Sequence, residues 1–358
     1  MSIQKFIYTE KFILESGASL SGLEIGYQTF GTLNSSKDNV VWVCHALTGN
    51  SDVFDWWKGL FGDDDFFNPR DHFIVCANII GSNYGSTNPL SVNPDTGKPY
   101  FLSFPQFNVR DIVAMHQLLA SHLNIQDIPV LIGGSLGGQQ AVEWAIIEPE
   151  RIKNLILIAT NAIHSPWGIA FNESQRLALE SDSTFFDQVI DGGRNGLRAA
   201  RSIALLSYRN YETYENSQKE DSNSIIDNFK AASYQKYQGE KLVKRFNAYS
   251  YWYLTKVMDS HNVGRNRSSV VDSLKQIKSK TLVVAIKSDL LFPPSEQKFL
   301  AANIPGGSYL EIDSFYGHDG FLIETGILTY EIFNFLKSVS KVKSNTLHDI
   351  AQSGSDKV

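Results

Sequence analysis

Short apolar runs rich in β-branched residues alternate with longer segments of helical periodicity along most of this chain. Runs that are apolar at nearly every residue suit strands buried on both faces, as in a parallel sheet covered by helices. Segment 111–123 (DIVAMHQLLASHL) and segment 320–336 instead place apolar residues at helical spacing. The alternation predicts an α/β fold with a mostly parallel central sheet flanked by helices. The strand-like runs are 40–44, 73–78, 128–132, 156–159, 281–286 and 309–312.

That alternation stops between about residues 165 and 272. Helix-like segments follow one another there without a convincing strand: ESQRLALE, NGLRAARSIALLSY, IIDNFKAASYQKY and LVKRFNAYSYWYLTKVMD. Residues 165–272 are therefore predicted to be a helical insertion that forms a lid over the sheet. The core then consists of residues 1–164 and 273–340, and residues 341–358 form a polar C-terminal tail that is expected to fray.

Composition excludes several classes of partner. The net charge of −6 gives no electrostatic footprint for nucleic acid or for an anionic membrane. The N-terminus has no apolar stretch of signal-peptide length, and no run of about 18 apolar residues occurs. Both cysteines, Cys44 and Cys76, lie inside strand-like apolar runs, which is typical of buried free thiols. We therefore expect a cytoplasmic protein.

The pentapeptide Gly133-Gly134-Ser135-Leu136-Gly137 is the strongest chemical signal in the chain. It follows the strand-like IPVLI and precedes the helix-like GGQQAVEWAI, which is the setting of a nucleophile elbow. Glycines on both sides permit the tight turn that exposes a serine hydroxyl. A Gly-rich turn that merely starts a helix has the same pattern, so the pentapeptide alone does not decide between the two.

Two later residues favour the nucleophile. A serine hydroxyl reacts only when a base takes its proton, and that base needs an orienting carboxylate. Asp289 follows the strand-like TLVVAI, and His318 follows the strand-like SYLEID, so both are expected at the carboxyl ends of strands. The order serine, acid, histidine is that of the nucleophile-elbow hydrolases. We predict Ser135 as nucleophile, His318 as general base and acid, and Asp289 as the residue that orients it.

Acyl transfer also needs N–H donors for the tetrahedral oxyanion. The backbone amide of Leu136, the residue after the nucleophile, is one candidate. The loop HALTG follows the strand-like VVWVC, and the amide of Leu47 in that loop is the second candidate.

Segments along nearly the whole chain resemble the homoserine O-acetyltransferase family, acyl-CoA-dependent enzymes of methionine biosynthesis with the α/β-hydrolase fold. The resemblance includes the segments LESGASLSGLEIGYQTFGTLN, CHALTGNSDV, NPDTGKPY, GGSLGGQQAVEWA, SDLLFPP and YGHDGFL. Many α/β hydrolases share G-x-S-x-G, but few combine it with the NP-x-TGKPY, SD-x-LFPP and GHD-x-FL segments.

The resemblance implies roles for particular residues. Ser135, Asp289 and His318 fall on the family's triad, Arg201 matches an arginine that holds the homoserine carboxylate, and Asp319 matches the acceptor for its ammonium group. Arg209 lies about two helical turns after Arg201, so the choice between the two arginines stays open. The segment GSNYGSTNPL departs from the expected pattern at Asn83 and Asn88, which leaves the acyl preference open.

The implied reaction is ping-pong transfer of an acetyl group from acetyl-CoA to L-homoserine by a homodimer. Serine as acceptor, succinyl-CoA as donor, an esterase and a non-catalytic binding protein are the alternatives. The eight histidines show no H-E-x-x-H spacing, so we expect no metal, and CoA would be a substrate rather than a cofactor. Basic residues that could meet its phosphates, or simply face solvent, are Lys241, Lys244, Arg265 and Arg267.

Overall fold

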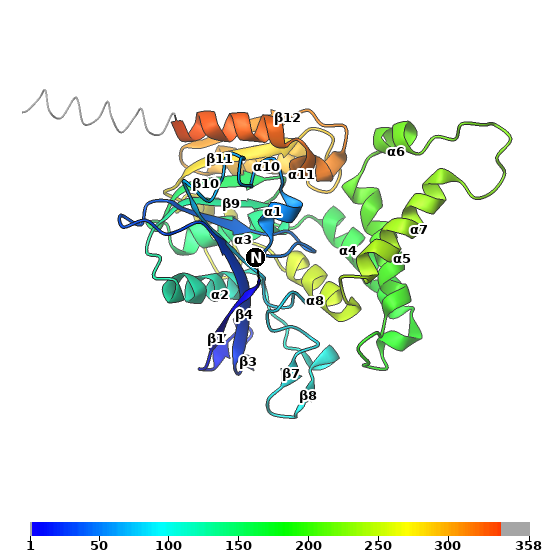
Figure 1. Ribbon diagram of the computed structural model, residues 1–358, viewed down its shortest axis with the longest axis horizontal. Helices are drawn as coiled ribbons and strands as arrows, with labels where there is room; N and C mark the ends of the chain where they lie inside the picture. The colour runs from blue at the N-terminus through cyan, green and yellow to red at the C-terminus, as the bar shows by residue number, and fades with distance from the viewer. Residues whose placement is uncertain (1, 338–358) are drawn as a thin grey trace, which may run out of the picture.

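The computed structural model describes residues 2–337, and the predicted tail at 341–358 lies outside this range. An eight-stranded sheet runs through the core in the order β1-β4-β6-β5-β9-β10-β11-β12 (Figure 1). The first two strands pair antiparallel and β4 also pairs antiparallel with β6, whereas all later neighbours pair parallel. The strands are β1 (Gln4–Tyr8), β4 (Leu23–Phe30), β5 (Val40–Cys44), β6 (Phe73–Ala77), β9 (Ile128–Gly134), β10 (Ile152–Ile158), β11 (Lys280–Ile286) and β12 (Gly307–Ile312).

The central strands are buried on both faces, as their continuous apolar runs predict. In β5 the side chains of Val40, Trp42 and Cys44 join one apolar cluster, and those of Val41 and Val43 join the other. Helices α2 (Val109–His122) and α3 (Leu136–Ile147) contribute to the first cluster. The second cluster is closed by residues from α1 (Val53–Trp56) and from a helix over 325–337. The predicted α/β fold is therefore confirmed.

Between β10 and β11 the described chain forms helices and no named strand. In Figure 1 helices α5, α6 and α7 stand to one side of the sheet, while α8 reaches back toward it. This is the segment that we propose as an insertion at 165–272. Its helices are α4 (Pro166–Glu180), α5 (Arg194–Tyr208), α6 (Tyr211–Ser217), α7 (Lys230–Val243), α8 (Ala248–Asp259) and α9 (Val270–Leu274).

Two predicted helices are each broken in the structure. The segment LVKRFNAYSYWYLTKVMD is interrupted after Val243, because the Asn247 side chain accepts a hydrogen bond from the Ser250 amide at 2.8 Å and starts α8 there. The C-terminal helix is interrupted at Glu324, between α11 (Gly320–Ile323) and the helix over 325–337. In both places the helical spacing of apolar residues in the sequence continues past a position where a helix ends in the structure.

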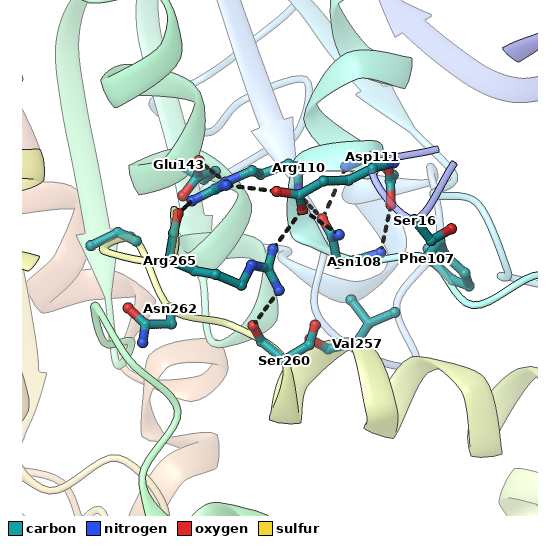
Figure 2. Close-up of polar contacts among 12 residues, drawn as sticks. Ser16, Phe107, Asn108, Arg110, Asp111, Glu143, Val257, Ser260, Asn262 and Arg265 are labelled. Atoms are coloured by element: carbon teal, nitrogen blue, oxygen red, sulfur yellow. Dashed lines mark hydrogen bonds and ion pairs between the residues drawn. The ribbon is translucent and has the colours of Figure 1, made fainter. Parts of the chain in front are cut away.

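A network of ion pairs ties the start of the chain to the insertion (Figure 2). Arg110 on α2 bonds Glu15 at 2.7 Å and Glu143 on α3 at 2.9 Å. Arg265, which follows α8, bonds the other Glu15 oxygen at 2.7 Å, and Arg267 bonds Glu143 at 2.5 Å. Glu143 is buried, so these partners compensate a charge that would otherwise be costly to bury.

Two short two-stranded pairs, one further α-helix and three 3-10 helices (Phe101–Ser103, Ser183–Phe185 and Gly317–Asp319) complete the described fold. Strand β2 (Phe12–Ile13) pairs with β3 (Ser19–Leu20), and β7 (Val92–Asn93) pairs with β8 (Lys98–Pro99). Helix α10 (Pro294–Asn303) packs against β11 and β12. No helix within residues 2–337 has both the length and the apolar character that crossing a bilayer requires.

Candidate active site

Ser135 sits in a strained turn between β9 and α3. Its backbone has φ 57° and ψ −126°, a conformation that non-glycine residues rarely adopt. A Cβ atom on Gly137 would overlap the carbonyl oxygen of Cys44, and one on Gly133 would overlap the carbonyl oxygen of Gly137. The two flanking glycines therefore let the turn pack this tightly, and the turn presents Ser135 above the carboxyl end of the sheet.

The structure brings the three predicted triad residues together in one hydrogen-bonded chain. The His318 Nε2 atom lies 2.9 Å from Ser135 Oγ, and His318 Nδ1 lies 2.7 Å from Asp289 Oδ2. The second Asp289 oxygen accepts from the amides of Leu291 and Phe292 at 2.8 and 2.9 Å. Because a carboxylate only accepts, the ring hydrogen belongs on Nδ1, and Nε2 is left to accept the Ser135 proton.

The environment of His318 fits a general base. Burial of the ring is the largest single effect and lowers its pKa, but the charge and hydrogen bond of the Asp289 carboxylate and the charge of Asp319 all raise it, and together they outweigh burial. The pKa of His318 is therefore raised above its ordinary value. The ring of Phe292 stacks on it at a centroid distance of 5.1 Å and holds its plane.

Ser135 and His318 open into a cavity of about 390 Å³. Its walls come from the loop after β5, from α1 and from the loop that carries His318, and the insertion supplies the remaining side. The insertion residues in the wall are Arg201, Tyr208, Lys241 and Arg245.

The two predicted oxyanion donors lie at different places in this site. Leu47, in the loop after β5, lines the cavity, whereas Leu136 is buried as the first residue of α3. Within the described part of the chain, neither backbone amide donates a hydrogen bond to another protein group. Both N–H groups are therefore available to a substrate oxygen.

Arg201 and Arg209 have different surroundings. Arg201 lines the cavity, with its guanidinium carbon 5.2 Å from the centre of the Tyr208 ring. Arg209 is ion-paired with Asp319 and is not part of the cavity wall. Helix α5 ends at Tyr208, and Arg209 has extended backbone angles, so its side chain leaves the helical face that carries Arg201. The geometry thus favours Arg201 as the cavity-facing cation and gives Asp319 a protein partner that the sequence did not indicate.

The basic residues that the sequence analysis named as possible partners of the CoA phosphates also have different surroundings. Lys241 lines the cavity, whereas Arg265 and Arg267 belong to the ion-pair network with Glu15 and Glu143. Neither Arg265 nor Arg267 lines the cavity, and both have ion-pair partners, so neither is a solvated side chain without a partner. A role of either residue in binding the CoA phosphates stays a prediction.

Arg245 and Tyr208 are cavity residues that the sequence analysis did not single out. Tyr208 could have been found, since it follows Arg201 by two helical turns on the same face. Arg245 lies in the break between α7 and α8, which the sequence analysis did not predict, so its place in the cavity wall could not be foreseen. Its Nη1 donates to the Thr48 carbonyl at 2.6 Å and to the Tyr84 hydroxyl at 2.7 Å.

Comparisons with known proteins agree with this geometry. A family model described as the alpha/beta hydrolase fold matches residues 39–325. The homoserine O-acetyltransferase of Cyclobacterium marinum is 48% identical, with 94% of this chain and 95% of that protein covered. The crystal structure of homoserine O-acetyltransferase from Bacillus anthracis is similar with a TM-score of 0.84 at 22% identity, over 94% of this chain and 97% of that one.

A solved esterase structure is as similar to this chain as the solved acetyltransferase is. The crystal structure of esterase E22 is similar with a TM-score of 0.84 at 22% identity, over 94% of this chain and 100% of that one. Identities this low establish the fold alone for both solved structures.

Proposed function

The chain belongs to the homoserine O-acetyltransferase family of α/β hydrolases, and on that premise we propose that it transfers an acetyl group from acetyl-CoA to the hydroxyl of L-homoserine. The observation that carries this proposal is the hydrogen-bonded chain of Ser135, His318 and Asp289 at the base of a cavity that also contains Arg201 and Asp319. Nucleophile, base and two groups of opposite charge are thereby placed within one small volume.

In the first half-reaction Ser135 attacks the thioester carbonyl. His318 Nε2 takes the hydroxyl proton as the Oγ–C bond forms, and Asp289 stabilises the imidazolium that results. The amides of Leu47 and Leu136 bind the oxyanion. When the C–S bond breaks, His318 returns the proton to the sulfur, and CoA leaves as the thiol.

In the second half-reaction the amino acid attacks the acetyl-serine. His318 takes the proton of the acceptor hydroxyl, and Ser135 leaves with that proton when the second tetrahedral intermediate collapses. Arg201 is proposed to bind the acceptor carboxylate, because a guanidinium matches a carboxylate with two parallel bonds. Asp319 is proposed to accept from the ammonium group. One methylene distinguishes homoserine from serine, which is worth only about 1–3 kcal/mol of discrimination.

Transfer instead of hydrolysis requires that water be kept from the acetyl-serine. The insertion residues Arg201, Tyr208, Lys241 and Arg245 in the cavity wall support the insertion as that shield. An esterase is the second candidate, because esterase E22 has the same fold and the triad alone is sufficient for ester hydrolysis.

The wider setting is also proposed. No resident cofactor or metal is needed for these steps, and the product would serve methionine biosynthesis. Exposed apolar side chains on the insertion, including Leu206, Ile226 and Phe229, support a homodimer formed through it. The buried free thiols of Cys44 and Cys76 support a cytoplasmic location.

The experiment measures CoA release from acetyl-CoA with a thiol-reactive dye, with and without L-homoserine, on wild type and Ser135→Ala. Release that needs both homoserine and Ser135 would support the proposal. Equal Ser135-dependent release without an amino acid would establish the esterase instead. Loss of the nucleophile should lower the rate by roughly four to six orders of magnitude. Repeating the assay with L-serine and with succinyl-CoA ranks the acceptor and the donor.

A further inference from the structure

The two candidate oxyanion amides share an arrangement that does not involve the triad. In a trans peptide the C=O and N–H groups point in opposite directions, and the described chain contains no cis peptide. The direction of the Leu47 N–H is therefore set by whatever holds the carbonyl of Ala46. In the same way, the direction of the Leu136 N–H is set by whatever holds the carbonyl of Ser135.

The Ala46 carbonyl is held from two sides. The amide of Gly49 donates to it at 2.9 Å, and the Nδ1 atom of His45 lies 2.8 Å from it. The amide of Ile79 donates to His45 Nε2 at 3.2 Å, so the ring hydrogen is on Nδ1 and points at the Ala46 carbonyl. His45 is fully buried, and burial lowers its pKa to about 4, so the ring stays neutral in this tautomer near pH 7.

The Ser135 carbonyl is held in a parallel way from the neighbouring strand. The Thr160 hydroxyl donates to it at 2.8 Å, and the amide of Gln139 donates at 3.1 Å. Thr160 follows β10 and has no exposed surface. Its own carbonyl accepts from the Gln297 side chain at 2.5 Å, which fixes its backbone.

We propose that His45 and Thr160 are positioning residues that aim the two oxyanion amides, each by binding the carbonyl of the same peptide. A hydrogen bond to a carbonyl also polarises its peptide group and strengthens the N–H at the other end as a donor. Both side chains are buried and lie outside the cavity wall, so each would act on the transition state through one peptide group. This inference rests on the proposed function only in taking Leu47 and Leu136 as the oxyanion donors.

Thr160→Val and Thr160→Ser provide the test at one amide. Valine keeps the shape and removes the hydroxyl, whereas serine keeps the hydroxyl. The rate of the p-nitrophenolate burst from p-nitrophenyl acetate measures acylation of Ser135 without any amino-acid acceptor. We expect Thr160→Val to lower the burst rate about 10- to 100-fold, less than the loss of a whole oxyanion donor. Thr160→Ser should stay within about threefold of wild type, because it keeps the bond.

His45→Asn and His45→Leu repeat the test at the other amide. The side-chain nitrogen of an asparagine at this position can take the place of the imidazole Nδ1 and donate to the Ala46 carbonyl, whereas leucine has no donor. We expect the asparagine variant to retain more of the burst rate than the leucine variant. Because the two positions are tested separately, a failure of either histidine variant to fold leaves the Thr160 pair decisive.

A second readout separates positioning from a merely structural role. A methyl boronic acid that forms a tetrahedral adduct with Ser135 should lose affinity in Thr160→Val by the same factor as the burst rate. The KM for p-nitrophenyl acetate and the unfolding midpoint should change little. A wild-type burst rate in Thr160→Val would overturn the proposal, as would a loss that Thr160→Ser shares in full. If wild type acylates normally but never passes the acetyl group to homoserine, the proposed function fails while this inference stands.

Discussion

Arg209 forms an ion pair with Asp319, the residue that directly follows His318. The backbone of Arg209 also lies against Gly317, where a Cβ atom would come within 3.0 Å of its carbonyl carbon. The end of α5, which carries Arg201 and Tyr208, is thereby fastened to the loop that carries His318, the proposed general base. The proposed amino-acid subsite and His318 are consequently joined through direct contacts of neighbouring residues.

Replacing Arg201 should impair the acceptor half-reaction alone. Arg201→Gln removes the cavity-facing guanidinium, and a charged hydrogen-bonded pair is worth enough to raise the KM for homoserine roughly 10- to 100-fold. The burst of acylation should be unchanged, since Arg201 is not expected to contact the acyl donor. Steady-state and burst kinetics on the same preparation measure both effects. Arg194→Gln, a change to an exposed arginine on the same helix, is the control, and a slower burst in Arg201→Gln would contradict the assignment.

Replacing Arg245 should loosen the oxyanion loop from the side of the insertion. Its guanidinium bonds the Thr48 carbonyl at 2.6 Å, and Asn83 donates to the Arg245 carbonyl at 3.0 Å. Arg245→Met keeps an unbranched apolar stem in place of the Cβ–Nε part of the arginine side chain and removes these guanidinium bonds. We expect kcat to fall about tenfold, the equivalent of one hydrogen bond, and the share of CoA released without homoserine to rise.

Lys244→Met is the matched control for that experiment, because Lys244 is exposed, adjacent and absent from the cavity wall. Both variants are assayed for CoA release with and without homoserine. An unchanged ratio of hydrolysis to transfer in Arg245→Met would show that the insertion does not act through this contact.

The sequence predicts the triad because each member has a local signature. Ser135 lies in a five-residue motif with glycines that the turn requires, and Asp289 and His318 each follow a recognisable buried strand. In a parallel sheet the ends of such strands meet at one edge, so the strand pattern alone brings the three residues close together.

The remaining contacts depend on distances in space that no local pattern encodes. The Arg245 contact with Thr48 joins residues 197 positions apart, and the bond between Arg265 and Glu15 joins residues 250 positions apart. Arg209 was a candidate for the cavity because helical periodicity was assumed to continue, whereas α5 ends one residue earlier. Asn247 is a residue type that starts helices, and it is the local signal in the sequence for the break beside Arg245.

Glu296 is expected to make stability depend on pH. The pKa of Glu296 is raised to about 7, chiefly by burial, although Asn161 donates to its carboxylate at 3.0 Å and thereby acts to lower it. Between the lower pKa of Glu296 in the unfolded chain and its pKa of about 7 in the folded protein, the folded state keeps a proton on Glu296 that the unfolded state has released. The resulting stability is fully present at about pH 4 and is lost as pH rises through about 7.

Glu296→Gln stays neutral at every pH and tests this dependence. Urea midpoints should favour the variant over wild type at pH 8 by more than at pH 5. Glu150→Gln, a change to an exposed glutamate that pairs with Lys278, is the control and should show no such trend. A difference between Glu296→Gln and wild type that is constant from pH 5 to pH 8 would count against a partly buried, protonated Glu296.

Acylation should fail on the acidic side as His318 becomes protonated, because an imidazolium cannot accept the Ser135 proton. The pKa of His318 is raised, so the burst rate should fall as pH drops through a value above the ordinary pKa of about 6.5. Asp289→Asn removes the carboxylate that raises this pKa. We expect its acidic limb to move to lower pH, while the plateau falls about a thousandfold or more because the ring loses its orientation. Burst rates measured from pH 5 to pH 9 give both quantities, and a limb that stays in place would mean that Asp289 does not set the pKa of His318.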